Sequence, residues 1–375
     1  MTPKETLEQT PWAKLEHAYG EAVDTPEFLE VLLRPEEQVS AEDFEELEDH
    51  LYTAVLHQGT VYPATVPAYD FMTEALPTLD GTRRELALDW MCSVAEVMDY
   101  VSEDSVLSWM RELKLEDLYS MKREDHRDIP WLVSTWQLQQ RANKTIDTLM
   151  ELTGLDSDVL ACVCKTLASC ARCSGAKHQR ERVSTYIWQR MEEADDDLKV
   201  QLSVCLGIME EDLSEFLNHP NPALRAAAAL GVKTPEGTAE LVDALRKPDE
   251  CRKWDFLSYF STIDTIVEEL IDRKTPPALM LDSVCVLIRE SGGLGGTLTW
   301  GPIFQYCFHY DETSDSSLLN EDQRILAQAM VDNPRLWAEN DGNCQFLRRD
   351  VGLPNTREEV RDLIKRSSVS FPGEC

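Results

Sequence analysis

The chain is built from short amphipathic helices separated by short turns, and no other feature of the sequence constrains its fold as strongly. A typical segment is SAEDFEELEDHLYTAVL, residues 40–56. Ser40 is a predicted N-cap, Asp43 occupies the capping-box position, and apolar residues from Phe44 to Val55 recur at the spacing of one helical face. Many such helices joined by short loops predict an antiparallel stack.

The same periodicity extends over most of the 375 residues. Leu, Ala and Glu are plentiful, only 16 residues are Gly, and β-branched runs are few, which favours helix over strand. The predicted fold class is therefore all-α. Besides residues 40–56, we expect helices over about residues 25–34, 66–76, 83–101, 136–153, 157–172, 182–193, 197–209, 211–217, 223–231, 236–247, 253–260, 262–272, 277–290, 320–332 and 357–366.

One segment, DLSEFLNHPNPALRAAAALGV at residues 212–232, has the form of a repeat unit. Pro222 suits the first turn of its second helix, Asn221 can cap that helix, and Arg225 can reach back to the preceding turn. Weaker similarities to this second helix occur at irregular spacing elsewhere in the sequence. We therefore expect residues 1–375 to form a single continuous stack of degenerate repeats.

Two segments interrupt the pattern. Residues 103–135 mix tryptophans with charged residues and are expected to be an insertion or a long connection. Residues 291–318 combine glycines, an aromatic stretch and a polar tail, and are expected to be a loop segment. Long loops are the places where function concentrates in proteins of this kind.

These stretches resemble HEAT-repeat proteins, which are α-solenoids of paired antiparallel helices. FLNHPNPALRAAAALGV, residues 216–232, is similar to a HEAT turn and second helix. LHQGTVYPATVPAYDFM, residues 56–72, and residues 318–364 resemble a bacterial and fungal group of uncharacterised HEAT-repeat proteins. The resemblance covers about residues 40–100 and 195–365. It implies a right-handed α-solenoid of degenerate HEAT-like hairpins that serves as a binding surface.

The net charge is −33, from 69 acidic and 36 basic residues. An acidic surface repels nucleic-acid phosphates and anionic lipid, so these partners are disfavoured and a basic protein partner is favoured. Acidic runs are often only solvated helix faces, but repeats can merge them into one surface. The candidate partner-binding residues are Glu42, Glu45, Glu46, Asp49, Asp195, Asp196 and Asp197.

The chain contains 11 cysteines, an odd number scattered among apolar helical positions. The first residues do not have the pattern of a signal peptide, and no apolar run is long enough to span a membrane. We therefore expect a cytoplasmic protein with free thiols and no membrane association. Cys170 and Cys173 have the spacing of a zinc-ligand pair, but Cys162 and Cys164 would point about 200° apart on one helix. No metal site and no cofactor are predicted.

A catalytic site finds little support in the sequence. The motifs of kinases, P-loop proteins, zinc proteases and serine hydrolases are missing or incomplete. The stretch HQGTVYPATVPAYDF, residues 57–71, is expected to be a helix–helix corner, with positive φ at Gly59 and Thr65 as helix cap. If the protein is an enzyme, its candidate pocket residues are His57, Tyr62, Asp70, Trp131 and His309.

One local basic cluster lies in residues 172–190. HEAT-like DNA glycosylases grip phosphates with such clusters, but the charge of the whole chain opposes that function. The favoured function is a protein-binding module or scaffold for a basic partner, for example an immunity-type protein that neutralises a toxin. The alternatives are an enzyme with a pocket on the concave face, in a biosynthetic pathway for instance, and a nucleic-acid binder or glycosylase.

Overall fold

The chain is mostly helical, as the sequence predicts. The computed structural model describes residues 2–98, 129–257, 261–292, 296–309, 318–338 and 342–369. Within these ranges the strands form two short antiparallel hairpins, and all other regular structure is helical. The all-α fold class is therefore confirmed. No helix in the described ranges is both long and apolar enough to cross a membrane.

The chain divides into two compact units, which we call unit 1 (Met1–Leu198) and unit 2 (Lys199–Cys375). The boundary falls in the first turn of α12 (Asp196–Ile208). The expectation that all 375 residues form one continuous stack concerns how the two units join, and it stays a prediction.

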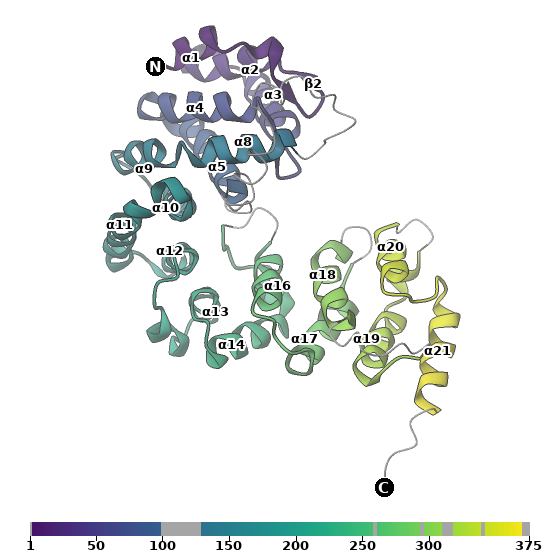
Figure 1. Cartoon of the computed structure of the whole chain (residues 1–375). Coiled ribbons are helices and arrows are strands. Elements are labelled where there is room, and N and C mark those ends of the chain that lie inside the picture. Colours follow the sequence, from purple (N-terminus) through teal and green to yellow (C-terminus); the bar gives the residue numbers. More distant parts are fainter. Residues whose placement is uncertain are drawn as a thin grey trace. The chain divides into compact units, whose positions relative to one another are not determined.

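Unit 1 contains two hairpins among its helices. Its elements are α1 (Pro3–Gln9), β1 (Glu16–His17), β2 (Gly20–Glu21), α2 (Thr25–Glu30), α3 (Ala41–His50), a π-helical turn (Leu51–Val55), β3 (Leu56–His57), β4 (Thr60–Val61), α4 (Thr65–Ala75), α5 (Gly81–Met98), α8 (Ile129–Gln139), α9 (Ala142–Met150), α10 (Ser157–Arg172) and α11 (Arg180–Glu193). Figure 1 shows these elements in purple to teal.

Local sequence accounts for where several of these helices begin. Ser40 and Asp43 form the predicted capping box at the start of α3, and the Asp156 carboxylate accepts the N–H of Val159 at the start of α10. Packing then assembles them: α1 lies on α4, α2 on α3, and α10 contacts α5, α9 and α11. Each described helix from α2 to α11 contributes buried apolar residues.

All regular secondary structure in the described residues of unit 2 is helical. After α12 its helices are α13 (Pro222–Gly231), α14 (Pro235–Leu245), α15 (Pro248–Cys251), α16 (Thr262–Asp272), α17 (Pro277–Glu290), α18 (Gly296–His309), α19 (Glu321–Asp332), α20 (Gly342–Asp350) and α21 (Arg357–Val369). They run from green to yellow in Figure 1.

The helices of unit 2 lie in two rows. One row is α14, α17, α19 and α21, in which each helix contacts the next. The other is α16, α18 and α20, which contact one another in the same order. The rows are joined by contacts of α14 with α16, of α17 with α18, and of α18 with α19. Both rows are visible in Figure 1.

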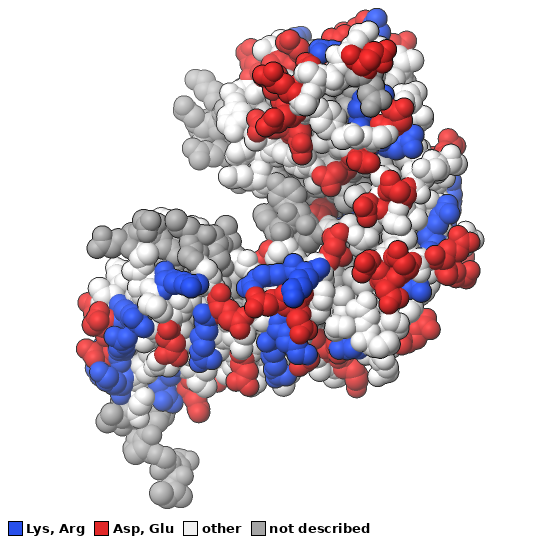
Figure 2. Space-filling view, turned by 180° about the vertical axis from the view of Figure 1, so that it is seen from behind, with Lys and Arg blue, Asp and Glu red and all other residues white. Residues whose placement is uncertain are grey.

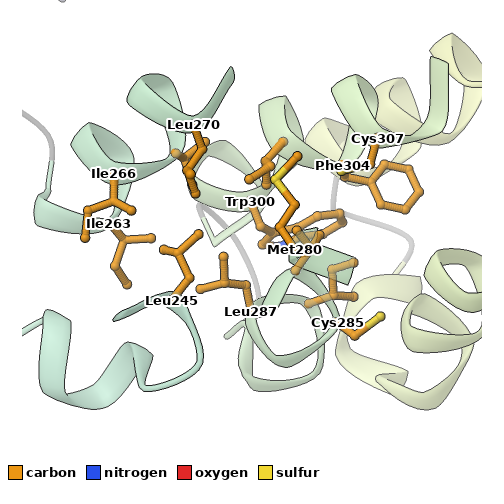
Figure 3. Close-up of a cluster of buried hydrophobic side chains, with 14 of the residues drawn as sticks. Leu245, Ile263, Ile266, Leu270, Met280, Cys285, Leu287, Trp300, Phe304 and Cys307 are labelled. Atoms are coloured by element: carbon orange, nitrogen blue, oxygen red, sulfur yellow. The ribbon is translucent and has the colours of Figure 1, made fainter. Parts of the chain in front are cut away.

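The core of unit 2 fills the space between these rows. Figure 3 shows Leu245 of α14 and Met280 of α17 facing Ile266 of α16 and Trp300 and Phe304 of α18. All five side chains are almost completely buried. Burial of each large apolar side chain contributes about 2 kcal/mol, so this layer stabilises the pairing of the two rows.

Three expectations from the sequence are wrong in part. Residues 296–309 form helix α18 rather than a loop, because Trp300, Phe304 and Phe308 recur on one face and are buried. The helix expected over 253–260 is not formed at 253–257; instead Asp255 accepts the N–H of Leu257 in a local turn. The helix expected over 136–153 is divided into α8 and α9. The insertion expected over 103–135 lies outside the described residues as far as residue 128, and α8 begins at Ile129.

Candidate functional site

The two hairpins of unit 1 have a similar design. In each of them a histidine precedes the turn: His17 is paired with Gly20, and His57 is paired with Thr60. Each hairpin leads, a few residues later, into a helix that begins with threonine, α2 at Thr25 and α4 at Thr65. The residues at the second turn, Gln58 and Gly59, both have positive φ, as tight two-residue hairpins require.

Backbone hydrogen bonds connect the two hairpins. The N–H of Ala18 in the first turn donates to the carbonyl of Ala54 at 3.0 Å, and the N–H of Ala64 donates to the carbonyl of Glu16 at 3.1 Å. The first hairpin is thereby held against the end of the α3 segment. This contact brings the histidine of β1 close to the last residue of α3.

The resulting site consists of His17, Asp24 and His50. One potential ligand atom from each residue lies within 4.8 Å of the other two. The His17 Nε2 and Asp24 Oδ1 atoms are 3.0 Å apart, and the two imidazole rings meet edge to face with centroids 5.5 Å apart. His17 and His50 are only 5% and 6% exposed, whereas the Asp24 carboxylate is open to solvent. The site therefore consists of two buried imidazoles and one solvent-exposed carboxylate.

Hydrogen bonds fix the protonation of His17. The backbone N–H of Tyr19 donates to His17 Nδ1 at 3.1 Å, so Nδ1 carries a lone pair rather than a proton. The neutral ring then has its proton on Nε2, from which it donates to Asp24. This arrangement ties the tip of the first hairpin to the turn before α2.

His50 is buried to a similar extent, and no described carboxylate forms a hydrogen bond with it. Its ring stacks on Phe28 with centroids 4.2 Å apart, and its Nε2 is 3.0 Å from the Thr25 hydroxyl. Burial lowers the pKa of His50 to about 4, and the neighbouring His17 contributes in the same direction against an opposing effect of Asp24. His50 is therefore neutral at pH 7, with a nitrogen lone pair available to a hydrogen-bond donor or an electrophile.

The segment of sequence that contains this site is acidic. Residues 16–50 contain 13 Asp and Glu residues and one Arg. Unit 1 has 40 acidic and 18 basic residues, a net charge of −22, compared with 29 and 18, a net charge of −11, in unit 2. On the face in Figure 2, red side chains predominate over unit 1, while red and blue alternate over unit 2.

The seven acidic residues proposed from the sequence are all exposed. Glu42, Glu45, Glu46 and Asp49 lie on α3, and none of them forms an ion pair with a described Lys or Arg. Asp195 accepts the N–H of Leu198 and so caps α12; Asp196 and Asp197 follow it in the first turn. The α3 residues thus keep their full negative charge for solvent or a partner.

The proposed catalytic residues occupy separate environments. His57 Nδ1 lies 2.7 Å from the Thr53 carbonyl and its ring is edge-on to Tyr19. Asp70 accepts three hydrogen bonds from Arg141, at 3.0 to 3.1 Å, in a bidentate ion pair that joins α4 to the start of α9. Because these bonds occupy both Asp70 oxygens, Asp70 has a structural role.

The remaining three candidate residues are Tyr62, Trp131 and His309. The Tyr62 backbone N–H donates to the hydroxyl of Thr65, which itself donates to the Val55 carbonyl; Thr65 therefore locks the corner instead of capping α4 as expected. Trp131 lies partly exposed in the first turn of α8. His309 is the exposed last residue of α18, in unit 2.

The cysteine segment of α10 has the properties of a packed helix. Ten cysteines are described, all as free thiols, and all except Cys162 are buried. Burial raises the pKa of Cys170 to about 12, and its sulfur lies 3.8 Å from the Tyr69 hydroxyl. Such thiols are poor metal ligands because they are rarely ionised.

The basic cluster over 172–190 is partly engaged within the protein. Arg182 forms an ion pair with Asp147 at 2.6 Å, and the Arg190 guanidinium lies over the Tyr186 ring. These contacts hold Arg182 and Arg190 against their own unit.

Sequence patterns alone do not identify His17, Asp24 and His50. They come from three elements and have no fixed spacing, so no linear motif connects them. The sequence does contain one indication of the two hairpins. The segment EHAYGEAVDTP, residues 16–26, is similar to LHQGTVYPATVP, residues 56–67, and each segment contains one hairpin. Comparison of the chain with protein-family models, with curated proteins and with solved structures finds no match in any of the three.

Proposed function

We propose that the protein is a binding module whose unit 1 recognises a basic protein through the acidic surface formed by α3 and the first hairpin. The observation that carries this proposal is the exposed set of α3 carboxylates without a described cationic neighbour, within a segment of 13 acidic residues and one Arg. Such a surface attracts a positively charged partner and accelerates its encounter.

The proposed architecture is a right-handed α-solenoid of degenerate HEAT-like hairpins. The two rows of helices in unit 2 support it, because successive hairpins of a solenoid place alternate helices in two layers. The turn before α13 also supports it: Asn221 caps the helix, and Arg225 donates to the carbonyl of His219 at 2.9 Å. Solenoids of this kind offer extended surfaces for protein partners.

In its sharpest form the proposed function is neutralisation of a basic toxin in the cytoplasm by an immunity-type complex. Free thiols fit a reducing compartment. The acidic surface fits a partner that itself binds anionic substrates, since a protein inhibitor of such a partner presents carboxylates in the place of phosphates.

The location of the charges can be tested with a charge-neutral variant of α3. Glu42→Gln, Glu45→Gln, Glu46→Gln and Asp49→Asn together remove four charges from exposed positions. We expect the Kd for a labelled deca-lysine peptide to rise about tenfold, because each exposed charge pair contributes a few tenths of a kcal/mol. Fluorescence anisotropy over a series of salt concentrations measures both the Kd and its salt dependence, and the dependence should weaken in the variant.

A matched control removes four exposed charges from unit 2. Glu215→Gln, Asp272→Asn, Asp282→Asn and Glu290→Gln give a chain of equal net charge, and none of these residues forms an ion pair with a described Lys or Arg. This variant should bind the peptide like the original protein. Equal losses in the two variants would mean that only the total charge matters, and binding without salt dependence would contradict the electrostatic proposal. Retention of the protein on heparin at low salt would instead favour a nucleic-acid partner.

A further inference from the structure

The three converging side chains of the histidine site have the separation that a small metal ion requires. A tetrahedral zinc site has bonds of about 2.0 Å, which places ligand atoms about 3.3 Å apart. His17 Nε2 and Asp24 Oδ1 are already 3.0 Å apart, and no pair in the cluster exceeds 4.8 Å. Closure around an ion therefore needs a change of about 1.5 Å or less in these separations.

The ligand types select the class of ion. Two imidazole nitrogens and one carboxylate suit zinc and its neighbours in the first transition series, whereas calcium and magnesium prefer sites made of oxygen alone. Three protein ligands leave a fourth tetrahedral position open for water. We propose that His17, Asp24 and His50 bind one divalent transition-metal ion of the zinc class.

The surroundings of the site support this assignment. Phe28 stacks on His50, and the Thr25 hydroxyl contacts His50 Nε2, so the ring is held by neighbours on two sides. Imidazole ligands are commonly oriented by such outer contacts. Asp24 is the one exposed member, with its side chain 47% accessible, and it offers the route by which an ion reaches the buried histidines.

Metal binding moves the proton of His17 from one ring nitrogen to the other, and this movement can be detected. In the metal-free protein His17 carries its proton on Nε2 and accepts the Tyr19 N–H at Nδ1. The metal ion takes the place of the Nε2 proton, and that proton moves to Nδ1, so the ring stays neutral. The Tyr19 N–H then loses its acceptor, because a protonated Nδ1 cannot accept a hydrogen bond. The Tyr19 amide should therefore report metal binding.

The experiment uses the full chain, treated with a chelator and titrated with Co²⁺ as the probe. We expect visible d–d bands of tetrahedral Co²⁺ that saturate at one equivalent, and competition by Zn²⁺ that abolishes them. In an amide NMR spectrum of a parallel titration with Zn²⁺, which is diamagnetic, the Tyr19 resonance should shift. Absence of these bands, or binding of Co²⁺ with millimolar affinity only, would overturn the proposal.

Variants separate the ligands from adventitious sites. His17→Gln and His50→Gln should each weaken Co²⁺ binding about 100-fold or more, since even outer contacts to ligands cost 10–100-fold. Asp24→Asn changes an exposed residue and keeps the fold, so it tests the site if a histidine variant unfolds; it should weaken binding at least about tenfold. His57→Gln and His219→Gln are the controls and should bind like the original protein. Weakening by either control equal to that of His50→Gln would refute the ligand set.

The metal proposal is independent of the proposed protein-binding function. The α3 variant that lacks four acidic charges leaves all three ligands in place and should bind Co²⁺ unchanged. Loss of Co²⁺ binding in that variant would show that exposed carboxylates, and not the histidine site, hold the ion.

Discussion

Replacement of Gly237 with Ala is expected to lower the free energy of unfolding by about 2 to 3 kcal/mol. Gly237 lies in the first turn of α14, where its N–H donates to the Thr234 hydroxyl that caps the helix. A Cβ atom at this position would lie 2.2 Å from the backbone carbonyl oxygen of Val232. Because that oxygen belongs to the short connection from α13, it cannot move without displacing one of the two helices.

Whether Gly237→Ala lowers or raises the free energy of unfolding shows whether steric overlap or helix propensity dominates at this position. Alanine is favoured over glycine in a helix by about 1 kcal/mol, so propensity alone predicts a more stable variant. Gly292→Ala is the matched control in unit 2, since no atom lies within 4 Å of its added Cβ and its φ is not positive. Urea denaturation followed by circular dichroism should show the loss in Gly237→Ala and no loss in Gly292→Ala. Equal stability of the two variants would contradict the close approach of α13 and α14.

Replacement of Arg273 with Met is expected to cost about 3 to 5 kcal/mol of stability. The Arg273 side chain is 8% exposed and connects three helices. Its guanidinium donates to the carbonyls of Ala229 and Leu230 at the end of α13, to the Thr238 hydroxyl of α14 at 3.0 Å, and to Glu269 of α16 at 2.5 Å. Methionine fills similar volume but leaves the two backbone carbonyls and the Thr238 hydroxyl without this donor, and it leaves the Glu269 carboxylate with Lys233 as its remaining described cation.

Two further variants test whether the buried charge causes the loss. Arg246→Met removes a cation that is 47% exposed and paired with Asp243, so it should change stability by less than about 1 kcal/mol. The double variant Arg273→Met with Glu269→Met removes both charges and should recover part of the stability. Thermal unfolding of the four proteins measures these differences. A double variant less stable than Arg273→Met alone would show that Lys233 satisfies the Glu269 carboxylate without Arg273.

Local signals in the sequence predicted much of the helical structure. The bounds of α10, α16 and α17 match the expected ranges 157–172, 262–272 and 277–290. Each of these helices has a start signal in the sequence: Asp156 caps α10, Ser261 caps α16, and the Pro276–Pro277 pair stands at the start of α17. Caps and prolines act within one turn, so a single sequence contains all that is needed to place them.

The hairpins and the histidine site depend on contacts that the sequence does not display. Two-residue strands are too short to show alternation, and Gln58 takes a positive φ that its residue type does not predict. In the sequence His50 lies within the helix expected over residues 40–56, and its partner His17 lies 33 positions earlier. The bond from Ala18 to Ala54 brings them together, and such a long-range backbone bond has no linear signature.

The buried cysteines can report the local opening of the helices that contain them. Burial raises the pKa of Cys170, Cys251 and Cys307 to about 12, so these thiols are almost never ionised while their helices are closed. An alkylating reagent can therefore modify each one only during a transient excursion that exposes it. Since the thiols are spread over both units, the order in which they are labelled would rank the helices from the most labile to the most protected, without any probe being introduced.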